Sequence, residues 1–154
     1  MAERKHKQIY KKAMKAAKSK NPNNEAVFEL LKAAYKEGSG DAAAAIANWY
    51  VHGIYVRKNA RTAVSWFSRS AKLGSGEGYH GLAVSFQQGS GGVKKSQRKA
   101  YEYYVAAALR GEESSLREVG RCLWYGYGVK LDKTLAEIWL ARADELGVPD
   151  DGSD

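Results

Sequence analysis

The chain has 154 residues, of which 44% are hydrophobic and 27% charged, a composition that allows one globular domain with its own core. No apolar run approaches the roughly 20 residues of a membrane span, and the single cysteine, Cys122, excludes an internal disulfide, so we expect a cytoplasmic protein without membrane association. The net charge of +8 comes largely from residues 1–20, which hold eight basic side chains and one acidic one.

The first two predicted helices cover residues 4–19 and 25–37. Between them, Asn21-Pro22-Asn23-Asn24 combines residue types that favour a turn. In both segments the apolar residues recur at helical spacing, three and four positions apart. We interpret these helices as a degenerate first repeat with a more polar face, as expected of a terminal copy with one neighbour.

Six further helices are predicted at residues 41–52, 60–73, 77–88, 97–110, 113–125 and 133–146. They form three pairs, because Gly53, Gly89 and Gly126 recur at intervals of 36 and 37 residues. Glycines also follow the second helix of each pair, and glycine at these positions is typical of left-handed helix caps. The second set of glycines is Gly74, Gly111 and Gly147.

Short polar residues stand at the start of three helices, where a side-chain oxygen can accept an unpaired backbone N–H bond: Asp41, Ser96 and Asp132. A single helix pair cannot bury its apolar side alone, so the pairs are expected to stack. The large apolar side chains at repeat positions should then form the core. They are Tyr50, Trp66, Phe67, Phe86, Trp139 and Leu140.

The clearest copy of the repeat is the last, which reads Val119-Gly120-x-x-Leu123-x-x-Gly126-Tyr127-Gly128-Val129-x-x-Asp132-x-x-x-Ala136-x-x-Trp139. This pattern resembles the Sel-one-like repeat, a relative of the tetratricopeptide repeat, closely over residues 41–148 and weakly over 8–38. Tyr55 departs from it, because it replaces the second glycine of the loop. The resemblance implies an all-α fold, a right-handed α/α solenoid of about four helix-pair repeats.

We therefore predict one domain over residues 1–148, followed by an acidic tail at 149–154. Its repeats are expected at residues 4–38, 39–74, 75–111 and 112–147.

The resemblance also implies that the first helix of each pair lines the concave surface of the solenoid. With Ile46 and Tyr50 directed to the core, the opposite face of that helix carries Asn48 and His52. The repeat extends this face into a polar and aromatic stripe, which adds Gln87, Gln88, Arg121, Trp124 and Tyr125. Arg, Trp and Tyr often anchor interfaces, so we predict a partner-binding face. The alternative is an ordinary exposed helix face, with Trp124 packed on a neighbour.

Sites for chemistry are not expected in this chain. The three histidines, His6, His52 and His80, are widely spaced and lack metal-ligand companions. Gly89-Ser-Gly-Gly92 lacks the Gly-Lys-Ser/Thr of a phosphate-binding loop, and no nucleophile–base pair can be assembled. We predict no catalytic residue, no metal and no cofactor.

The predicted function is a scaffold or adaptor that binds another protein in its concave groove. A narrower version is a bacterial immunity or chaperone protein whose basic head attracts an acidic partner. The alternative is a nucleic-acid-binding solenoid that uses residues 1–20 and the basic connectors near Arg57 and Lys94. The nearly neutral remainder of the chain and its acidic C-terminus argue against nucleic acid.

Overall fold

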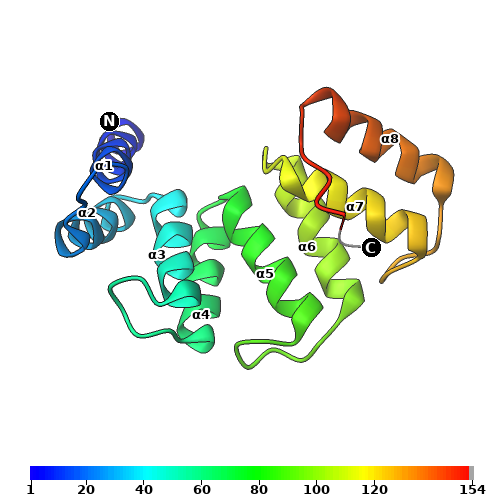
Figure 1. Ribbon diagram of the computed structural model, residues 1–154, viewed down its shortest axis with the longest axis horizontal. Coiled ribbons are helices and arrows are strands. Elements are labelled where there is room, and N and C mark those ends of the chain that lie inside the picture. Colours follow the sequence, from blue (N-terminus) through cyan, green and yellow to red (C-terminus); the bar gives the residue numbers. More distant parts are fainter. Residues whose placement is uncertain (153–154) are drawn as a thin grey trace. The chain divides into compact units, whose positions relative to one another are not determined.

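In the computed structural model, which describes residues 1–152, the described chain forms eight helices and no strand (Figure 1). Each helix begins and ends within two residues of its predicted bounds, which confirms the all-α class. None of these helices is both long and apolar enough to cross a bilayer. The helices are α1 (Ala2–Ala17), α2 (Asn24–Lys36), α3 (Gly40–His52), α4 (Ala60–Lys72), α5 (Gly76–Gln88), α6 (Gln97–Leu109), α7 (Ser114–Tyr125) and α8 (Lys133–Glu145).

The described chain divides into two compact units, residues 1–78 and the residues from Tyr79 onward, with the boundary in the first turn of α5. Within the first unit, α1 packs on α2, α2 on α3, and α3 on α4. Within the second unit, α6 packs on α7 and α7 on α8, and Figure 1 shows α8 lying alongside α7. Within each unit, these helices therefore pack on helices adjacent in the sequence, as in a repeat array. The division into four repeats within one domain stays a prediction.

The second helices of the three repeats begin with the same cap. Asn59, Ser96 and Asp132 each accept a bond from the backbone N–H three residues later, at N···O distances of 3.0, 3.2 and 3.0 Å. These bonds confirm the predicted caps at Ser96 and Asp132. Three different side chains thus cap the helix, because each places an oxygen near an unpaired N–H.

The predicted cap at Asp41 is wrong. Helix α3 begins at Gly40, one residue earlier than expected, so Ser39 occupies the cap and its Oγ accepts from Ala42 N at 3.1 Å. Asp41 lies in the first turn, where its carboxylate accepts a bond of 2.6 Å from Ser75 Oγ. A carboxylate in the first turn is still favourable, because it faces the positive end of the helix dipole.

The connectors between the two helices of each of the three repeats share one backbone hydrogen bond. In each, the cap residue of the second helix donates its backbone N–H to a carbonyl near the end of the first helix, at 2.9 Å. The pairs are Asn59 to Tyr50, Ser96 to Phe86, and Asp132 to Leu123. Gly53 and Gly126 end their helices with φ of 69° and 75°, a left-handed conformation that only glycine adopts without strain.

Small residues dominate the buried core, and most of the predicted core aromatics lie at its edge. Of the six residues predicted to be core, only Phe67 is fully buried, with 6% of its surface exposed. Tyr50 and Trp66 in the first unit, and Phe86 and Trp139 in the second, are half-buried against the core clusters. Alanines fill the interior because they let helix axes approach closely, which leaves large rings at the rim. The fully buried alanines are Ala13, Ala34, Ala42, Ala43, Ala44, Ala47, Ala83, Ala107, Ala136 and Ala143.

Helices α7 and α8 approach each other closely at Gly120. A Cβ atom on this residue would lie 2.7 Å from Leu140 Cγ, too near for van der Waals contact. Glycine therefore allows Leu140 of α8 to lie directly against the backbone of α7. This contact sets the spacing of the two helices, between which the candidate site lies.

Candidate protein-binding site

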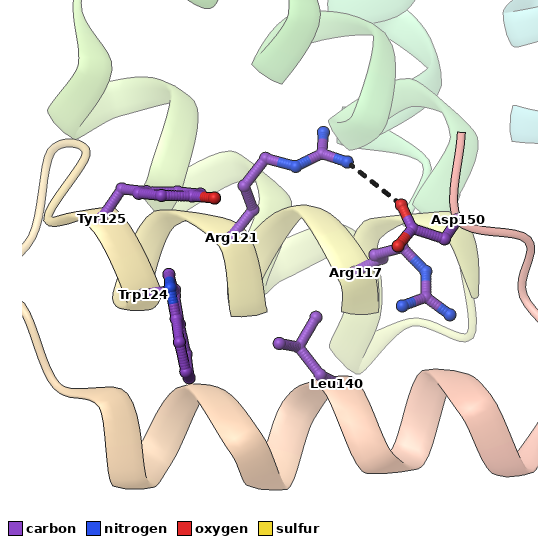
Figure 2. Close-up of a pocket in the computed structure, with 6 residues that line it drawn as sticks. All are labelled: Arg117, Arg121, Trp124, Tyr125, Leu140 and Asp150. Atoms are coloured by element: carbon purple, nitrogen blue, oxygen red, sulfur yellow. Dashed lines mark ion pairs between the residues drawn. The ribbon is translucent and has the colours of Figure 1, made fainter. Parts of the chain in front are cut away.

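A cavity of about 200 Å³ lies along α7 in the second unit (Figure 2). Helix α7 supplies four of its lining side chains, which are spaced so that they share one helix face. Helix α8 adds one, and the segment that follows α8 adds another. The lining consists of Arg117, Arg121, Trp124, Tyr125, Leu140 and Asp150. The structure thus brings together three residues of the predicted stripe, Arg121, Trp124 and Tyr125.

The opposite face of α7 is buried, and this burial orients the cavity side chains. Val119 and Leu123 are almost fully buried in the core of the second unit. Cys122 is 6% exposed, and burial raises the pKa of its thiol to about 11. The thiol therefore stays protonated at neutral pH, and Cys122 acts as a small core residue.

Trp124 packs on neighbouring residues, as the alternative interpretation expected, and it also lines the cavity. Its ring packs against the core of the second unit, and Figure 2 shows it directed toward α8. The ammonium group of Lys133 lies 5.1 Å from the ring centroid, within the range of a cation–π contact. Tyr125 is more open, with 43% of its surface exposed, and it stacks on Tyr127 at a centroid distance of 5.3 Å. Of these rings, those of Trp124 and Tyr125 line the cavity together with the arginines.

Arg117 is a cavity residue that the sequence analysis missed. It is only 9% exposed, and its Nη2 donates to Asp144 Oδ1 at 2.7 Å and to the Val148 carbonyl at 2.6 Å. Its Nε is buried and has no hydrogen-bond acceptor among residues 1–152. The signal was present in the repeat, because Arg117 stands where an earlier copy has Ala44, which is fully buried. Because a charged side chain is costly to bury, its presence at a buried repeat position distinguishes this repeat from the earlier one.

Arg121 is surrounded by carboxylates. Its side chain is 13% exposed, and its Nη1 donates to Glu118 Oε1 at 3.0 Å, within α7. Its Nη2 donates to Asp151 Oδ1 at 3.1 Å, and Asp150 Oδ1 lies 4.0 Å away, as the dashed line in Figure 2 marks. Two acids of the predicted acidic tail therefore lie at the predicted binding face.

The other predicted site residues lie elsewhere. Gln87 Oε1 accepts a bond of 2.6 Å from Tyr104 Oη and lines a separate cavity in the second unit. Gln88 is exposed at the end of α5. Asn48 and His52 are exposed on α3 in the first unit. A role of these four residues in binding stays a prediction.

One cluster resembles a catalytic arrangement in composition but not in geometry. Ser115 Oγ lies 2.8 Å from His80 Nδ1 and donates to Glu112 Oε2 at 2.8 Å, and that carboxylate oxygen is 3.2 Å from the same Nδ1. In a catalytic triad the histidine bridges serine and acid through its two different nitrogens. Here both partners meet at one nitrogen, and Ser115 is fully buried. The cluster is a structural network. No group of residues able to hold a metal ion occurs in the described part of the chain.

Comparison with known proteins places these helix pairs in a family. Residues 40–75, 76–112 and 114–148, most of the chain, each match the Sel1 repeat. The chain belongs to the Sel1 repeat family. Sel1 repeats typically form scaffolds for protein–protein interaction, and the family is generally non-catalytic. The resemblance read from the sequence is thereby confirmed.

Among curated proteins, this Sel1 repeat protein is similar to an F-box protein of Arabidopsis thaliana, with 31% identity over 93 residues. That match covers 59% of the chain and 24% of the plant protein, so the chain spans about a quarter of its relative.

Solved structures of Sel1-like proteins share the fold. A Sel1 repeat protein from Oxalobacter formigenes superposes with a TM-score of 0.73 at 26% identity, over 80% of this chain and 50% of that one. A protective antigen of uropathogenic Escherichia coli gives 0.80 at 22% identity, over 92% and 31%. The cysteine rich protein B of Helicobacter pylori gives 0.60 at 25% identity, over 79% and 91%. These likenesses confirm the helical solenoid as the fold.

Proposed function

We propose that this Sel1 repeat protein is a scaffold that holds a partner protein against α7. The observation that carries the proposal is the convergence of Arg121, Trp124 and Tyr125 on one cavity. These three residue types dominate the energetics of many protein interfaces, because they combine large contact area with specific hydrogen bonds. The family's typical role as an interaction scaffold supports the same function.

The proposal has a wider and a narrower form. In the wider form, the exposed residues Asn48, His52, Gln87 and Gln88 add polar contacts to the same partner. In the narrower form, the protein is a cytoplasmic immunity or chaperone protein for an acidic partner. The net charge of +8 and the basic N-terminal helix support an acidic partner, because unlike charges raise the encounter rate.

Capture of partners from the native source tests the scaffold function. We expect the wild-type chain to retain a partner protein that an Arg121→Ala/Trp124→Ala/Tyr125→Ala variant loses by at least about tenfold, since interface anchors each contribute about 1–2 kcal/mol or more. A matched triple variant on the exposed side of α6, Arg98→Ala/Glu102→Ala/Leu109→Ala, should retain it.

Two outcomes would contradict the scaffold function as proposed. Equal recovery of every protein by the wild type and the α7 variant would exclude this face of α7 as the binding site. Recovery of nucleic acid in place of a protein would favour the nucleic-acid alternative. A gel shift at low salt with a variant whose basic side chains in residues 1–20 are neutralised would then test that alternative.

A further inference from the structure

The segment that follows α8 lies against the α7 cavity. Its first contact is the Val148 carbonyl, which accepts a bond of 2.6 Å from Arg117 Nη2. Two residues further on, Asp150 lines the cavity, and Asp151 accepts a bond of 3.1 Å from Arg121 Nη2. Figure 2 shows this segment passing beside Arg117 and Arg121. The chain thus presents an apolar residue and two acids, in non-helical conformation, to two arginines.

We propose that the α7 cavity binds an extended acidic segment of a partner protein, and that residues 148–152 hold its place until the partner arrives. This inference rests on the proposed scaffold function and names the chemistry of the partner. The partner's carboxylates would take the position of Asp150 and Asp151 on Arg121.

The two sides of the contact differ in burial, and this difference favours exchange. The Arg121 side chain is 13% exposed, whereas those of Asp150 and Asp151 are 69% and 65% exposed. The arginine is held in place by α7 and by its bonds to Glu118, so it is a fixed receptor. Most of the surface of both aspartates faces water, and ion pairs with so exposed a partner contribute little. A longer acidic segment with additional contacts can therefore displace them.

Arg117 gives a second, independent reason to expect an acidic ligand. It is nine-tenths buried, and its Nε is a buried donor that has no acceptor among the described residues. Buried donors without acceptors are rare, and a guanidinium normally binds a carboxylate with two N–H groups at once. Of the two acceptors on Arg117 Nη2, one is Asp144, whose side chain is 70% exposed and easily moved. A partner carboxylate would supply the missing acceptor.

The walls of the cavity favour an apolar residue next to the acids. Trp124, Tyr125 and Leu140 line it together with the arginines. The chain's own segment has this composition, since Val148, which is half-buried, precedes Pro149 and the two acids. Proline also keeps the segment from continuing the helix, because it lacks a backbone N–H and disfavours helical geometry before it.

Peptide binding to the full chain tests the proposal. The probe is a fluorescent peptide that copies residues 146–152, Leu-Gly-Val-Pro-Asp-Asp-Gly, measured by anisotropy. We expect an Asp150→Asn/Asp151→Asn variant to bind it about fivefold more tightly than the wild type. This factor corresponds to a wild-type cavity that residues 148–152 occupy about four-fifths of the time. A peptide with asparagine at both acidic positions should bind the variant about tenfold more weakly, because it lacks the charge that Arg121 recognises.

Controls on the receptor side use the same variant as background. Adding Arg121→Gln should abolish acid-dependent binding, whereas adding Arg98→Gln, an exposed arginine paired with Glu102 on α6, should leave it unchanged. Helical circular dichroism and the midpoint of thermal unfolding verify that each variant is folded.

The proposal is overturned if the acidic and amide peptides bind equally, if neither binds, or if the variant binds no better than the wild type. The scaffold function would still be supported after any of those results, provided that the α7 triple variant fails to capture the partner that the wild type retains. Conversely, acid-dependent peptide binding together with undiminished partner capture by the triple variant would overturn the scaffold role of α7.

Discussion

At the scale of single residues, Glu112 is the acid whose surroundings alter its titration most clearly. Its Oε2 accepts bonds from Ser114 Oγ at 2.6 Å and from Ser115 Oγ at 2.8 Å, and lies 3.2 Å from His80 Nδ1. Burial alone would raise the pKa of this carboxyl, but the bonds from His80 and Ser114 outweigh burial and lower the pKa to about 2. The ionised form is therefore stabilised in the folded protein.

This pKa predicts an acid-dependent loss of stability. Because the folded pKa lies below the unfolded value of about 4.5, the unfolded chain takes up the proton first as the pH falls. The stabilisation is present above pH 4.5 and is lost between about 4.5 and 2. We expect the free energy of unfolding of wild type to exceed that of Glu112→Gln by about 2 kcal/mol at pH 7, and the difference to shrink through that interval.

Urea unfolding at a series of pH values measures this difference. The matched control is Glu102→Gln, because Glu102 is exposed and pairs with Arg98 of its own helix. A gap between wild type and Glu112→Gln that stays constant from pH 7 to pH 2 would show that the carboxylate contributes nothing through its charge.

Tyr55 is a second residue whose local conformation has consequences. It adopts φ of 63°, the left-handed region that Gly128 occupies in the last repeat with φ of 72°. A side chain there is strained, but the Tyr55 ring lies 5.5 Å from Phe28 and 6.3 Å from Trp49, so aromatic contacts offset the strain.

We expect Tyr55→Ala to destabilise the first unit by about 1–2 kcal/mol, because alanine keeps the strain and loses the rings. Tyr55→Gly should destabilise less, by about 1 kcal/mol, since glycine relieves the strain. Chemical unfolding monitored by tryptophan fluorescence measures both. Tyr127, which is similarly exposed but lacks a positive φ, is the control, and there glycine should be no better than alanine. Identical effects of glycine and alanine at position 55 would refute the strain.

At the scale of elements, each second helix depends on one polar side chain at its start. Asp132 Oδ1 accepts from Leu135 N at 3.0 Å, and the same residue donates its own N–H to the Leu123 carbonyl. The cap therefore joins the connector to α8. Because the backbone bond does not need the side chain, substitution should affect only the cap.

We expect Asp132→Ala to lower the free energy of unfolding by about 1 kcal/mol, the usual contribution of a helix cap. Asp132→Asn should retain most of the stability, because the amide oxygen can accept the same bond, as Asn59 does in the first unit. Urea titration of the two variants provides the measurement. An asparagine variant as unstable as the alanine variant would mean that the carboxylate charge, and not the cap bond, stabilises α8.

At the scale of the whole molecule, the charge is strongly uneven. Residues 1–20 hold eight basic side chains against one acid, whereas the chain after position 143 holds five acids and no base. Within the first unit, Lys11 and Lys15 are exposed on α1 and Lys18 is exposed at its C-terminal cap. Such a patch acts on the approach of a partner more than on the strength of the final contact.

We therefore expect the association rate with a captured acidic partner to fall about tenfold between 50 and 500 mM salt, because ions screen exposed charges beyond about 10 Å at 0.1 M. Lys11→Gln/Lys15→Gln/Lys18→Gln should flatten this dependence and leave the dissociation rate unchanged. Stopped-flow fluorescence measures both rates. The control, Lys94→Gln/Lys95→Gln/Lys130→Gln, removes the same charge from the connectors, and an equal effect would assign the attraction to net charge alone.

The amino-acid sequence determined the helices, their order and their periodic caps. Glycines such as Gly53 and Gly126 and polar caps such as Asp132 act through bonds to residues a few positions away, so their effects can be read locally. The same period placed Arg121, Trp124 and Tyr125 on one face of one helix, and the structure has them on one cavity.

The tertiary structure decided which residues are buried and what lies on the cavity. Burial follows the distance between helix axes, which facing alanines and Gly120 set, so that rings such as Trp66 and Trp139 lie at the rim. Arg121 and Asp151 are far apart along the chain, and they meet only because the segment after α8 turns back along α7. Helical periodicity describes neighbours within a turn or two, whereas contacts across such a distance depend on the path of the folded chain.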